Sequence, residues 1–155
     1  MEQPIEADGL EQLYREHRDR LWHAVFAYTG NREIAHDAVA EAFTQGITRE
    51  SELRDPLAWI WRVAFRVAAG ALKEQRRSVG EPREQHYEIP LQATEVFEAL
   101  RHLTRKQRAA VVLHHYAGYP VKEIASILGS TPAAVRVHLS AGRRRLRGLL
   151  EDDDE

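Results

Sequence analysis

The stretch VKEIASILGSTPAAVRVHLSAGRRRL, residues 121–146, predicts two helices joined by a tight turn. Gly129 suits the left-handed residue that follows a helix, Thr131 can cap the next helix, and Pro132 is tolerated at the first helical position. A short helix, a tight turn containing glycine and a longer basic helix form a helix-turn-helix, which lays its second helix in the major groove of DNA. The stretch therefore predicts a DNA-binding unit.

The helix after this turn has two unlike faces. Its apolar face, within about 40° of Val135 on a helical wheel, carries Leu139, Gly142, Leu146 and Leu149. The side about 80° to 180° away carries Arg136, Ser140, Arg143, Arg144 and Arg147. We expect the first face to dock on the protein and the second, nearly all cationic, to remain exposed.

Apolar residues three or four apart predict further helices upstream. The expected helices span residues 10–28, 31–47, 56–77, 95–102 and 105–116. Tyr14 and Ile47 belong to the apolar stripes of the first two. Candidate inward residues of the segment 95–116 are Val96, Leu100, Leu103, Val111, Val112 and His115. No alternating run of β-branched residues is long enough to predict a strand, so the expected fold class is all-α.

The helix expected over residues 56–77 has a basic face. Asp55 and Pro56 are a strong start signal, because Asp caps orphan amides and Pro fits the first position. The cations of this face lie within about 60° of Arg62 on the wheel and are Arg62, Arg66, Lys73, Arg76 and Arg77. The opposite side carries Ile60, Ala64, Val67 and Ala71. Because these five cations lie close together on the wheel, opposite a continuous apolar face, an anion-binding surface is favoured over a merely solvated one. For Trp59 and Trp61, packing is favoured over base stacking.

Two small helical domains joined by a linker are expected, the second containing the helix-turn-helix. The first spans residues 8–77, the linker 78–94 and the second domain 95–150, followed by an acidic tail at 151–155. The linker contains Gly80, Pro82 and Pro90 and has no helical period. The tail is interpreted as a disordered solubilising end in preference to a DNA mimic.

The net charge of -2, from 22 basic and 24 acidic residues, hides an uneven distribution. Residues 101–147 hold ten basic side chains and one acidic one, Glu123, which we interpret as a structural cap or salt-bridge partner. Residues 1–57 hold 12 acidic and six basic side chains. An acidic N-terminal part and a basic C-terminal part indicate that the two parts bind different partners.

Composition excludes several other classes. The chain has no cysteine, which excludes disulfides and thiolate zinc sites. No apolar run approaches the roughly 18 residues of a membrane helix, and the N-terminus lacks signal-peptide features, so a cytoplasmic protein without membrane insertion is expected. His102, His114 and His115 lack a metal-binding spacing, and neither metal nor cofactor is expected. Asp37 and Glu41 have no accompanying base or nucleophile, so an acidic surface is favoured over an enzyme site.

Three segments together resemble one family. Residues 121–146, with GNREIAHDAVAEAF (30–43) and WIWRVAFRV (59–67), resemble bacterial RNA polymerase sigma factors of the extracytoplasmic-function group of the sigma-70 family. The resemblance covers about residues 10–150. It implies a sigma region 2-like domain, a sigma region 4-like domain, and the function of binding core RNA polymerase and directing it to promoter DNA. An anti-sigma factor is a further partner that such a protein can have.

The resemblance also implies site residues. Those for the -35 element are Thr131, Pro132, Ala133, Arg136, Ser140, Arg143 and Arg144. Those for the -10 element are Trp59, Arg62, Arg66, Lys73, Arg76 and Arg77. Those for polymerase binding are Asp37, Glu41 and Phe43. Clustered cations suit phosphates, and Arg or small polar residues at the start of a groove-seated helix suit base edges.

The sequence departs from the family at four positions. The family usually has Glu at His36, Gln at Ala40, Asn at Arg66 and Asp at Gly70. Because the last two lie on the strand-separating helix, an alternative is a sigma-like decoy that binds polymerase or an anti-sigma factor without melting promoters. A second alternative is a simple helix-turn-helix transcription regulator.

Overall fold

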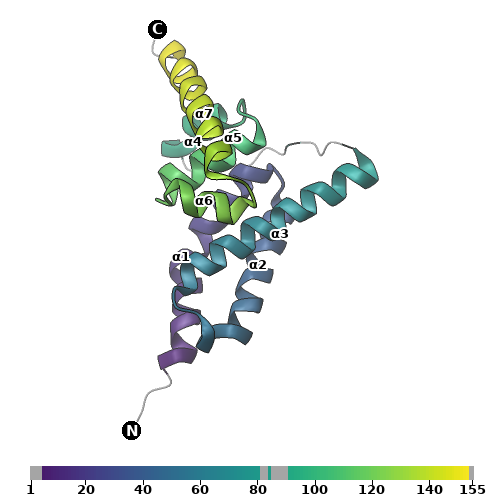
Figure 1. Ribbon diagram of the computed structural model, residues 1–155, viewed down its shortest axis with the longest axis vertical. Helices are drawn as coiled ribbons and strands as arrows, with labels where there is room; N and C mark the ends of the chain where they lie inside the picture. Colours follow the sequence, from purple (N-terminus) through teal and green to yellow (C-terminus); the bar gives the residue numbers. More distant parts are fainter. Residues whose placement is uncertain (1–4, 81–83, 85–90, 154–155) are drawn as a thin grey trace.

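The computed structural model describes residues 5–80, 84 and 91–153, and every regular element within them is a helix (Figure 1). The α-helices are α1 Ile5–Thr29, α2 Arg32–Arg49, α3 Pro56–Val79, α4 Leu91–Leu100, α5 Arg105–Val111, α6 Val121–Leu128 and α7 Pro132–Asp153. A 3-10 turn, η1 Glu50–Glu52, follows α2, and a π-helical turn, η2 Val112–Tyr116, continues α5. The all-α prediction is confirmed.

Helices α1, α2 and α3 pack together as the first half of the molecule. Local capping starts two of them, since Ile34 N donates to Asn31 Oδ1 at 3.0 Å and Ala58 N donates to Asp55 Oδ1 at 3.2 Å. Fully buried side chains of this half include Leu21, Val25, Ile60, Phe65 and Leu72. The C-terminal end of α3 projects beyond the rest of the molecule (Figure 1).

Helices α4 to α7 form the second half. Thr104 and Gln107 make a reciprocal capping box at the start of α5. Leu113, Ile124, Ile127, Val135 and Leu139 are buried in this half. Helix α7 packs on α5 and α6 and continues upward past them (Figure 1).

Several helix ends differ from those expected, and the first is the start of α1, which begins at Ile5 and not at residue 10. Helix α3 continues to Val79, and Gly80 ends it with φ 85°. Helix α4 begins at Leu91, within the predicted linker, because no helix-breaking residue separates Leu91 from Leu100. Helix α7 continues to Asp153, so the first three residues of the predicted acidic tail are helical. The other parts of the predicted linker and tail, residues 81–83, 85–90 and 154–155, lie outside the described residues.

Four expected core positions are wrong. Val96 is 46% exposed, Tyr14 38% and Ile47 66%, and His115 is exposed as well. For His115 the reason is the π turn, in which Ala117 N donates to Val112 O at 3.1 Å. A turn with i→i+5 hydrogen bonds contains one residue more than an α-helical turn. The side chains in and after this turn, including His115, therefore point in other directions than the α-helical period predicts.

The two halves are joined by Arg108, which is only 2% exposed. Its Nη1 donates to Ala27 O of α1 at 3.0 Å, and its Nη2 donates to Glu84 Oε1 at 2.7 Å. Its Nε donates to Leu100 O at 2.9 Å within the second half. Arg108 thus supplies donors to carbonyls at the C-terminal end of α1, where a helix leaves carbonyls unpaired and carries partial negative charge.

Neighbouring contacts strengthen this junction. Arg105 Nη2 donates to Thr29 O at 3.4 Å, also at the end of α1. The Arg20 guanidinium lies 4.6 Å from the centre of the Tyr116 ring and donates to the Tyr116 carbonyl. Burial lowers the pKa of Arg108, and the carboxylate of Glu84 opposes that shift. The charge is therefore buried together with an opposite charge and several carbonyls.

Candidate nucleic-acid interface

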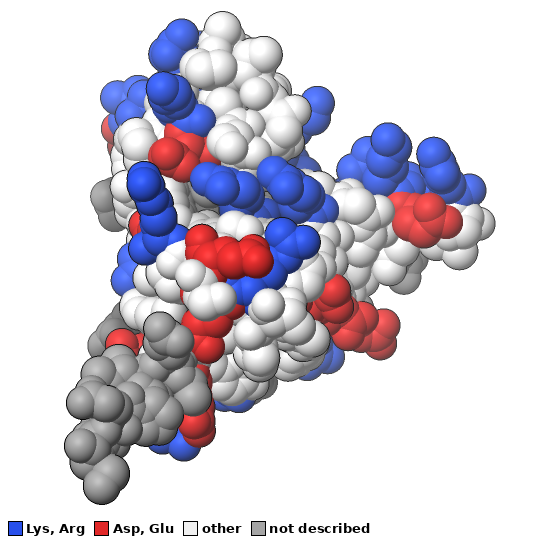
Figure 2. Space-filling model, turned by 60° about the horizontal axis from the view of Figure 1, so that its bottom comes forward, with Lys and Arg blue, Asp and Glu red and all other residues white. Residues whose placement is uncertain are grey.

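The basic face of α3 forms because the opposite side of this helix is core. Ile60, Ala64, Ala68 and Leu72 recur at helical spacing and are each 0% exposed. Of the cations on the other side, Arg66, Lys73, Arg76 and Arg77 are exposed, and the side chain of Arg62 is 31% exposed. Figure 2 shows basic side chains gathered on the projecting end of the molecule, which is the C-terminal end of α3. The structure therefore places the five predicted cations on one side of one helix.

Gly70 leaves an open gap on this exposed side. A Cβ atom built at Gly70 has no atom within 4 Å apart from its own helix and chain neighbours. Two turns farther along the same helix, Arg77 Nη1 lies 3.8 Å from Glu74 Oε2. Among the described residues, nothing packs against position 70, so the helix backbone there is accessible to a molecule bound to the basic face.

The N-terminal end of the basic face contacts the helix-turn-helix. Arg62 Nη2 lies 3.3 Å from Glu123 Oε2 on α6. The ring of Tyr119 lies 6.0 Å from that of Trp61, which is 3% exposed. Helix α6 therefore covers Arg62, whereas the cations farther along α3 stay exposed.

Trp59 lies at the edge of this contact. It is partly buried and lines a cavity of about 450 Å³ with Arg62, Tyr119 and Glu123. Burial, with a smaller contribution from Asp55, raises the pKa of Tyr119 to about 12. Trp61 is a packing residue, as favoured from the sequence, whereas Trp59 keeps part of its ring accessible beside the basic face.

The helix-turn-helix has the expected local geometry. Gly129 adopts the left-handed conformation with φ 65°, and Ser130 N donates to Ala125 O at 2.8 Å. Ala134 N donates to Thr131 Oγ1 at 3.1 Å, which caps the helix that begins at Pro132. The turn prediction made from Gly129, Thr131 and Pro132 is confirmed.

Helix α7 docks by a small-residue contact. Gly142 is buried, and a Cβ atom built there would lie 2.9 Å from Val111 Cγ2 on α5. Val135 and Leu139 are buried on the same side of α7. This orientation leaves the seven predicted -35 residues exposed: Thr131, Pro132, Ala133, Arg136, Ser140, Arg143 and Arg144.

The predicted polymerase-binding residues do not share one environment. Asp37 and Glu41 are exposed, one turn apart on α2. Phe43 is 5% exposed and its ring meets that of Tyr14 edge-on at 5.0 Å. Phe43 is thus a core residue in this structure and not part of the acidic surface, because α2 turns its apolar stripe, which includes Phe43, toward α1 and α3.

Sequence reasoning missed the contacts between the halves. Glu123 was expected to form a cap or salt bridge, but its partner, Arg62, lies in the other half of the chain. Arg108 lies in the basic segment RKQR with no local signal that it would be buried. Two of its acceptors, at Ala27 and Glu84, are far away in sequence, and only the three-dimensional arrangement identifies them.

The described residues lack two other kinds of site. Among the described residues, no group of three or more His, Cys, Asp or Glu side chains could hold a metal ion. None of the helices in the described ranges combines the length and apolar character needed to cross a membrane.

Comparisons with known proteins identify both halves. Residues 13–78 match the family model of sigma-70 region 2, and residues 93–146 match that of sigma-70 region 4. RNA polymerase sigma factor SigV of Bacillus subtilis is 22% identical over 90% of this chain and 89% of its own length. The ECF RNA polymerase sigma factor SigL of Mycobacterium tuberculosis is 26% identical over 95% of this chain and 92% of its own.

A solved structure shares the fold. The sigma factor RpoE of Bartonella quintana, crystallised in complex with the anti-sigma factor NepR, superposes with a TM-score of 0.76. It is 20% identical in sequence, and the alignment covers 91% of this chain and 96% of that one. The whole two-half arrangement, and not only the helix-turn-helix, therefore has a counterpart among known structures.

Proposed function

Because the chain belongs to the sigma-70 family, as an RNA polymerase sigma factor of the extracytoplasmic-function group that directs transcription initiation, we propose that its two basic surfaces divide promoter binding between them. The basic face of α3 contacts the -10 region, and the exposed side of α7 contacts the -35 element. The observation that carries the proposal is the segregation of cations onto the solvent side of α3, directly opposite a fully buried face.

The cations of α3 suit the phosphates of a separated strand. Arg66, Lys73, Arg76 and Arg77 project into solvent over several turns of helix and bring positive charge to a backbone that follows the face. The open position at Gly70 allows the nucleic acid to approach the helix closely. Trp59, beside Arg62, offers a ring for stacking with an unpaired base.

The start of α7 suits base edges in the major groove. Thr131, Pro132 and Ala133 are small, and Arg136 follows one turn later on the exposed side. Small residues allow close approach, and Arg forms paired hydrogen bonds with guanine. Arg143 and Arg144 lie two turns farther along and are positioned for phosphates.

The acidic surface of α2 suits a basic protein partner. Asp37 and Glu41 face solvent, and we assign core polymerase to them. Phe43 supports the same helix from inside and does not itself touch the partner. Because core polymerase and promoter DNA are the proposed partners, we propose that the protein acts in the cytoplasm.

Promoter contact by Arg62 requires movement of α6. Its partner Glu123 lies on the first helix of the helix-turn-helix, so the -10 surface is complete only when this pair separates. A half-exposed ion pair contributes less than about 1 kcal/mol, which polymerase binding easily offsets. By analogy with the relative crystallised with NepR, an anti-sigma factor is proposed as a partner that binds the chain in its inactive state.

Transcription with purified core polymerase tests the proposal. We expect a transcript that depends on both this chain and a promoter recovered from DNA bound in cells. Arg136→Ala should weaken binding to the cognate -35 sequence by roughly tenfold, since a lost base contact costs about 1–3 kcal/mol, and leave binding to unrelated DNA nearly unchanged. Equal loss on all sequences would make Arg136 a phosphate contact. Polymerase binding without any transcript would favour the decoy.

A further inference from the structure

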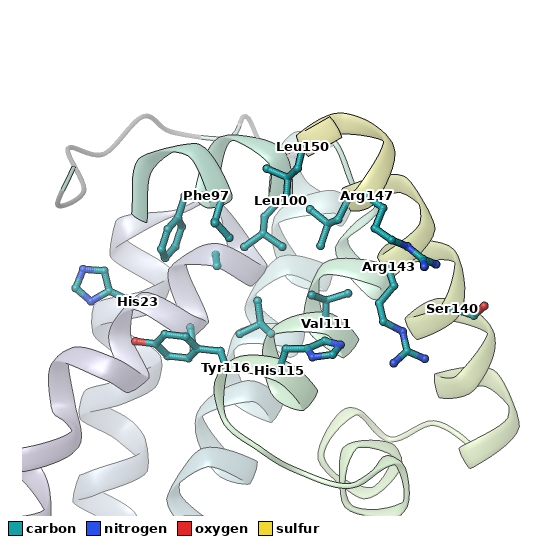
Figure 3. Close-up of a pocket in the computed structure, with 15 residues that line it drawn as sticks. His23, Phe97, Leu100, Val111, His115, Tyr116, Ser140, Arg143, Arg147 and Leu150 are labelled. Atoms are coloured by element: carbon teal, nitrogen blue, oxygen red, sulfur yellow. The ribbon is translucent and has the colours of Figure 1, made fainter. Parts of the chain in front are cut away.

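An apolar pocket lies between the two halves of the molecule, away from the basic face of α3. Its volume is about 670 Å³, within the range of roughly 300–1,000 Å³ typical of small-molecule sites. Figure 3 shows side chains from α1, α4, α5, η2 and α7 around it. Its apolar lining includes Ala27, Phe97, Leu100, Val111, Leu146 and Leu150.

The charge around this pocket has one sign. Arg143 and Arg147, one turn apart on α7, stand on one side of it, and none of the described lining residues is acidic (Figure 3). Burial, followed by the charges of His114 and Arg143, lowers the pKa of the lining residue His115. Arg143 and Arg147 are therefore the permanent charges of the site.

The pocket also explains two exposed apolar side chains. Val96 and Tyr116, which are 46% and 40% exposed, both line it. Large apolar side chains that remain exposed together around a concave surface mark a binding site more often than an accident of packing. The pocket thus combines an apolar interior, an apolar rim and a cationic side.

We propose that this pocket binds a small amphipathic anion, namely a single alkyl chain ending in a carboxylate. The alkyl chain lies against Phe97, Leu100 and Val111, and the carboxylate meets Arg143 and Arg147. Guanidinium groups bind carboxylates through paired, charge-assisted hydrogen bonds, which favours this head group. A polypeptide helix is disfavoured by size, because a cylinder about 10 Å wide fills the volume in fewer than about two turns.

A ligand here would act on both halves at once. Its alkyl chain would contact Ala27 of α1 and Val111 of α5, which stabilises the packed arrangement over a separated one. Its head group would occupy Arg143, which the proposed function assigns to promoter phosphates. This second consequence rests on the proposed function, whereas binding itself does not.

Calorimetric titration of the full chain with octanoate, decanoate and dodecanoate, each kept below its micelle concentration, tests binding without DNA. We expect the dissociation constant to fall about fourfold for each added methylene. Dodecanol, which lacks the charge, should bind at least tenfold more weakly than dodecanoate. An affinity independent of chain length would overturn the proposal, and so would binding to anionic phospholipid vesicles in the absence of binding to free dodecanoate.

Matched variants locate the site. The double variant Arg143→Met, Arg147→Met should bind dodecanoate at least tenfold more weakly. Arg136→Met with Arg144→Met removes two charges from the same helix outside the pocket and should leave binding unchanged. Val96→Glu, at a rim position that is 46% exposed, should weaken binding as well. Equal losses in both double variants would mean that charge alone attracts the ligand, and the pocket assignment would be wrong.

Promoter-dependent transcription by the assembled holoenzyme then tests ligand binding in the pocket separately from its effect on promoter contact. Saturating dodecanoate should reduce the transcript at least severalfold for the unaltered chain and have little effect with Val96→Glu. If dodecanoate binds in the calorimeter but transcription is unchanged, the binding site stands and its coupling to promoter contact is overturned. Loss of transcription without measurable binding would overturn the site itself.

Discussion

Arg108 is a buried charge in which each nitrogen of the guanidinium has an acceptor. The acceptors come from the end of α1, from Glu84 and from the second half's own carbonyls at Leu100, Arg101 and Leu103. Removing the guanidinium leaves buried carbonyls and a carboxylate unpaired. The resulting loss of stability is larger than the net stabilisation that the intact ion pair provides. Arg108 alone therefore makes many of the hydrogen bonds that hold the two halves together.

Replacement of this arginine should be strongly destabilising. We expect Arg108→Met to lower the free energy of unfolding by about 3–5 kcal/mol, as for other broken buried ion pairs. Arg144→Met, at an exposed position of α7, is the matched control and should change it by no more than about 0.5 kcal/mol. Urea denaturation followed by circular dichroism measures both, and similar values for the two variants would contradict the role given to Arg108.

Tyr119 predicts a dependence on alkaline pH. Its pKa rises from the ordinary 10.0 to about 12 in the folded chain, chiefly through burial. A raised folded-state pKa means that its contribution to stability is complete below about pH 10 and is lost as the pH rises toward 12. Burial also raises the pKa of Tyr28 and Tyr116, so they add to the same fall.

Tyr119→Phe should make the loss of stability between pH 10 and 12 shallower. Absorbance of tyrosinate at 295 nm should show that the variant lacks a group that ionises late in the native chain. An unchanged late phase in the variant would assign that ionisation to another tyrosine and contradict the burial of Tyr119 at the α3–α6 contact.

At the scale of single helices, two glycines of α7 have opposite environments. A Cβ atom at Gly142 would lie 2.9 Å from Val111 Cγ2 and 3.4 Å from Gln107 O, whereas one at Gly148 would have nothing within 4 Å outside the helix's own atoms. Glycine within a helix costs roughly 0.5–1 kcal/mol relative to alanine unless packing requires it. Gly142 therefore sets the distance between α5 and α7, and Gly148 does not.

Alanine at these positions should have effects of opposite sign. Gly148→Ala should raise the free energy of unfolding by about 0.5–1 kcal/mol through helix propensity. Gly142→Ala should lower it by about 1–2 kcal/mol, since the short, branched Val111 side chain has little freedom to move away. Thermal unfolding of the two variants side by side measures the difference, and stabilisation by both would refute the close approach of α5 and α7.

The basic face of α3 should determine much of the salt dependence of DNA binding. Each phosphate contact contributes about 0.9 to the slope of log K against log salt concentration on duplex DNA, and about 0.7 on single strands. Arg76→Ala with Arg77→Ala should therefore flatten this slope by roughly one to two in fluorescence-anisotropy titrations of promoter DNA. Arg15→Ala with Arg49→Ala, exposed on α1 and α2, is the matched two-charge control. An unaltered slope after loss of Arg76 and Arg77 would remove this end of α3 from the DNA site.

At the scale of the whole molecule, the two halves form one packed body. Arg108, the Arg62–Glu123 pair and the Trp61–Tyr119 contact lie at different places along the junction. Elements that share buried contacts unfold together, whereas halves joined only by a linker unfold independently. The junction also creates the apolar pocket, which neither half forms alone.

Unfolding should therefore be a single transition. All three tryptophans, Trp22, Trp59 and Trp61, lie in the first half, so their fluorescence reports on α1 to α3, whereas far-ultraviolet circular dichroism reports on both halves. The two signals should change at the same urea concentration in the unaltered chain. In Arg108→Met, the fluorescence and circular dichroism signals should change at different urea concentrations. Two midpoints in the unaltered chain would show that the junction adds little stability.

Local patterns determined most of the fold and the exposed position of the cations on α3 and α7. The turn at Gly129, the caps at Asp55 and Thr131 and the opposite faces of α3 and α7 follow from interactions between residues a few positions apart, which the sequence displays directly. Tertiary structure alone decided that Arg62 pairs with Glu123, that Arg108 is buried and that a pocket with a cationic side opens between the halves. These features depend on contacts between residues dozens of positions apart, and a local periodicity carries no information about which distant surface will cover a given face.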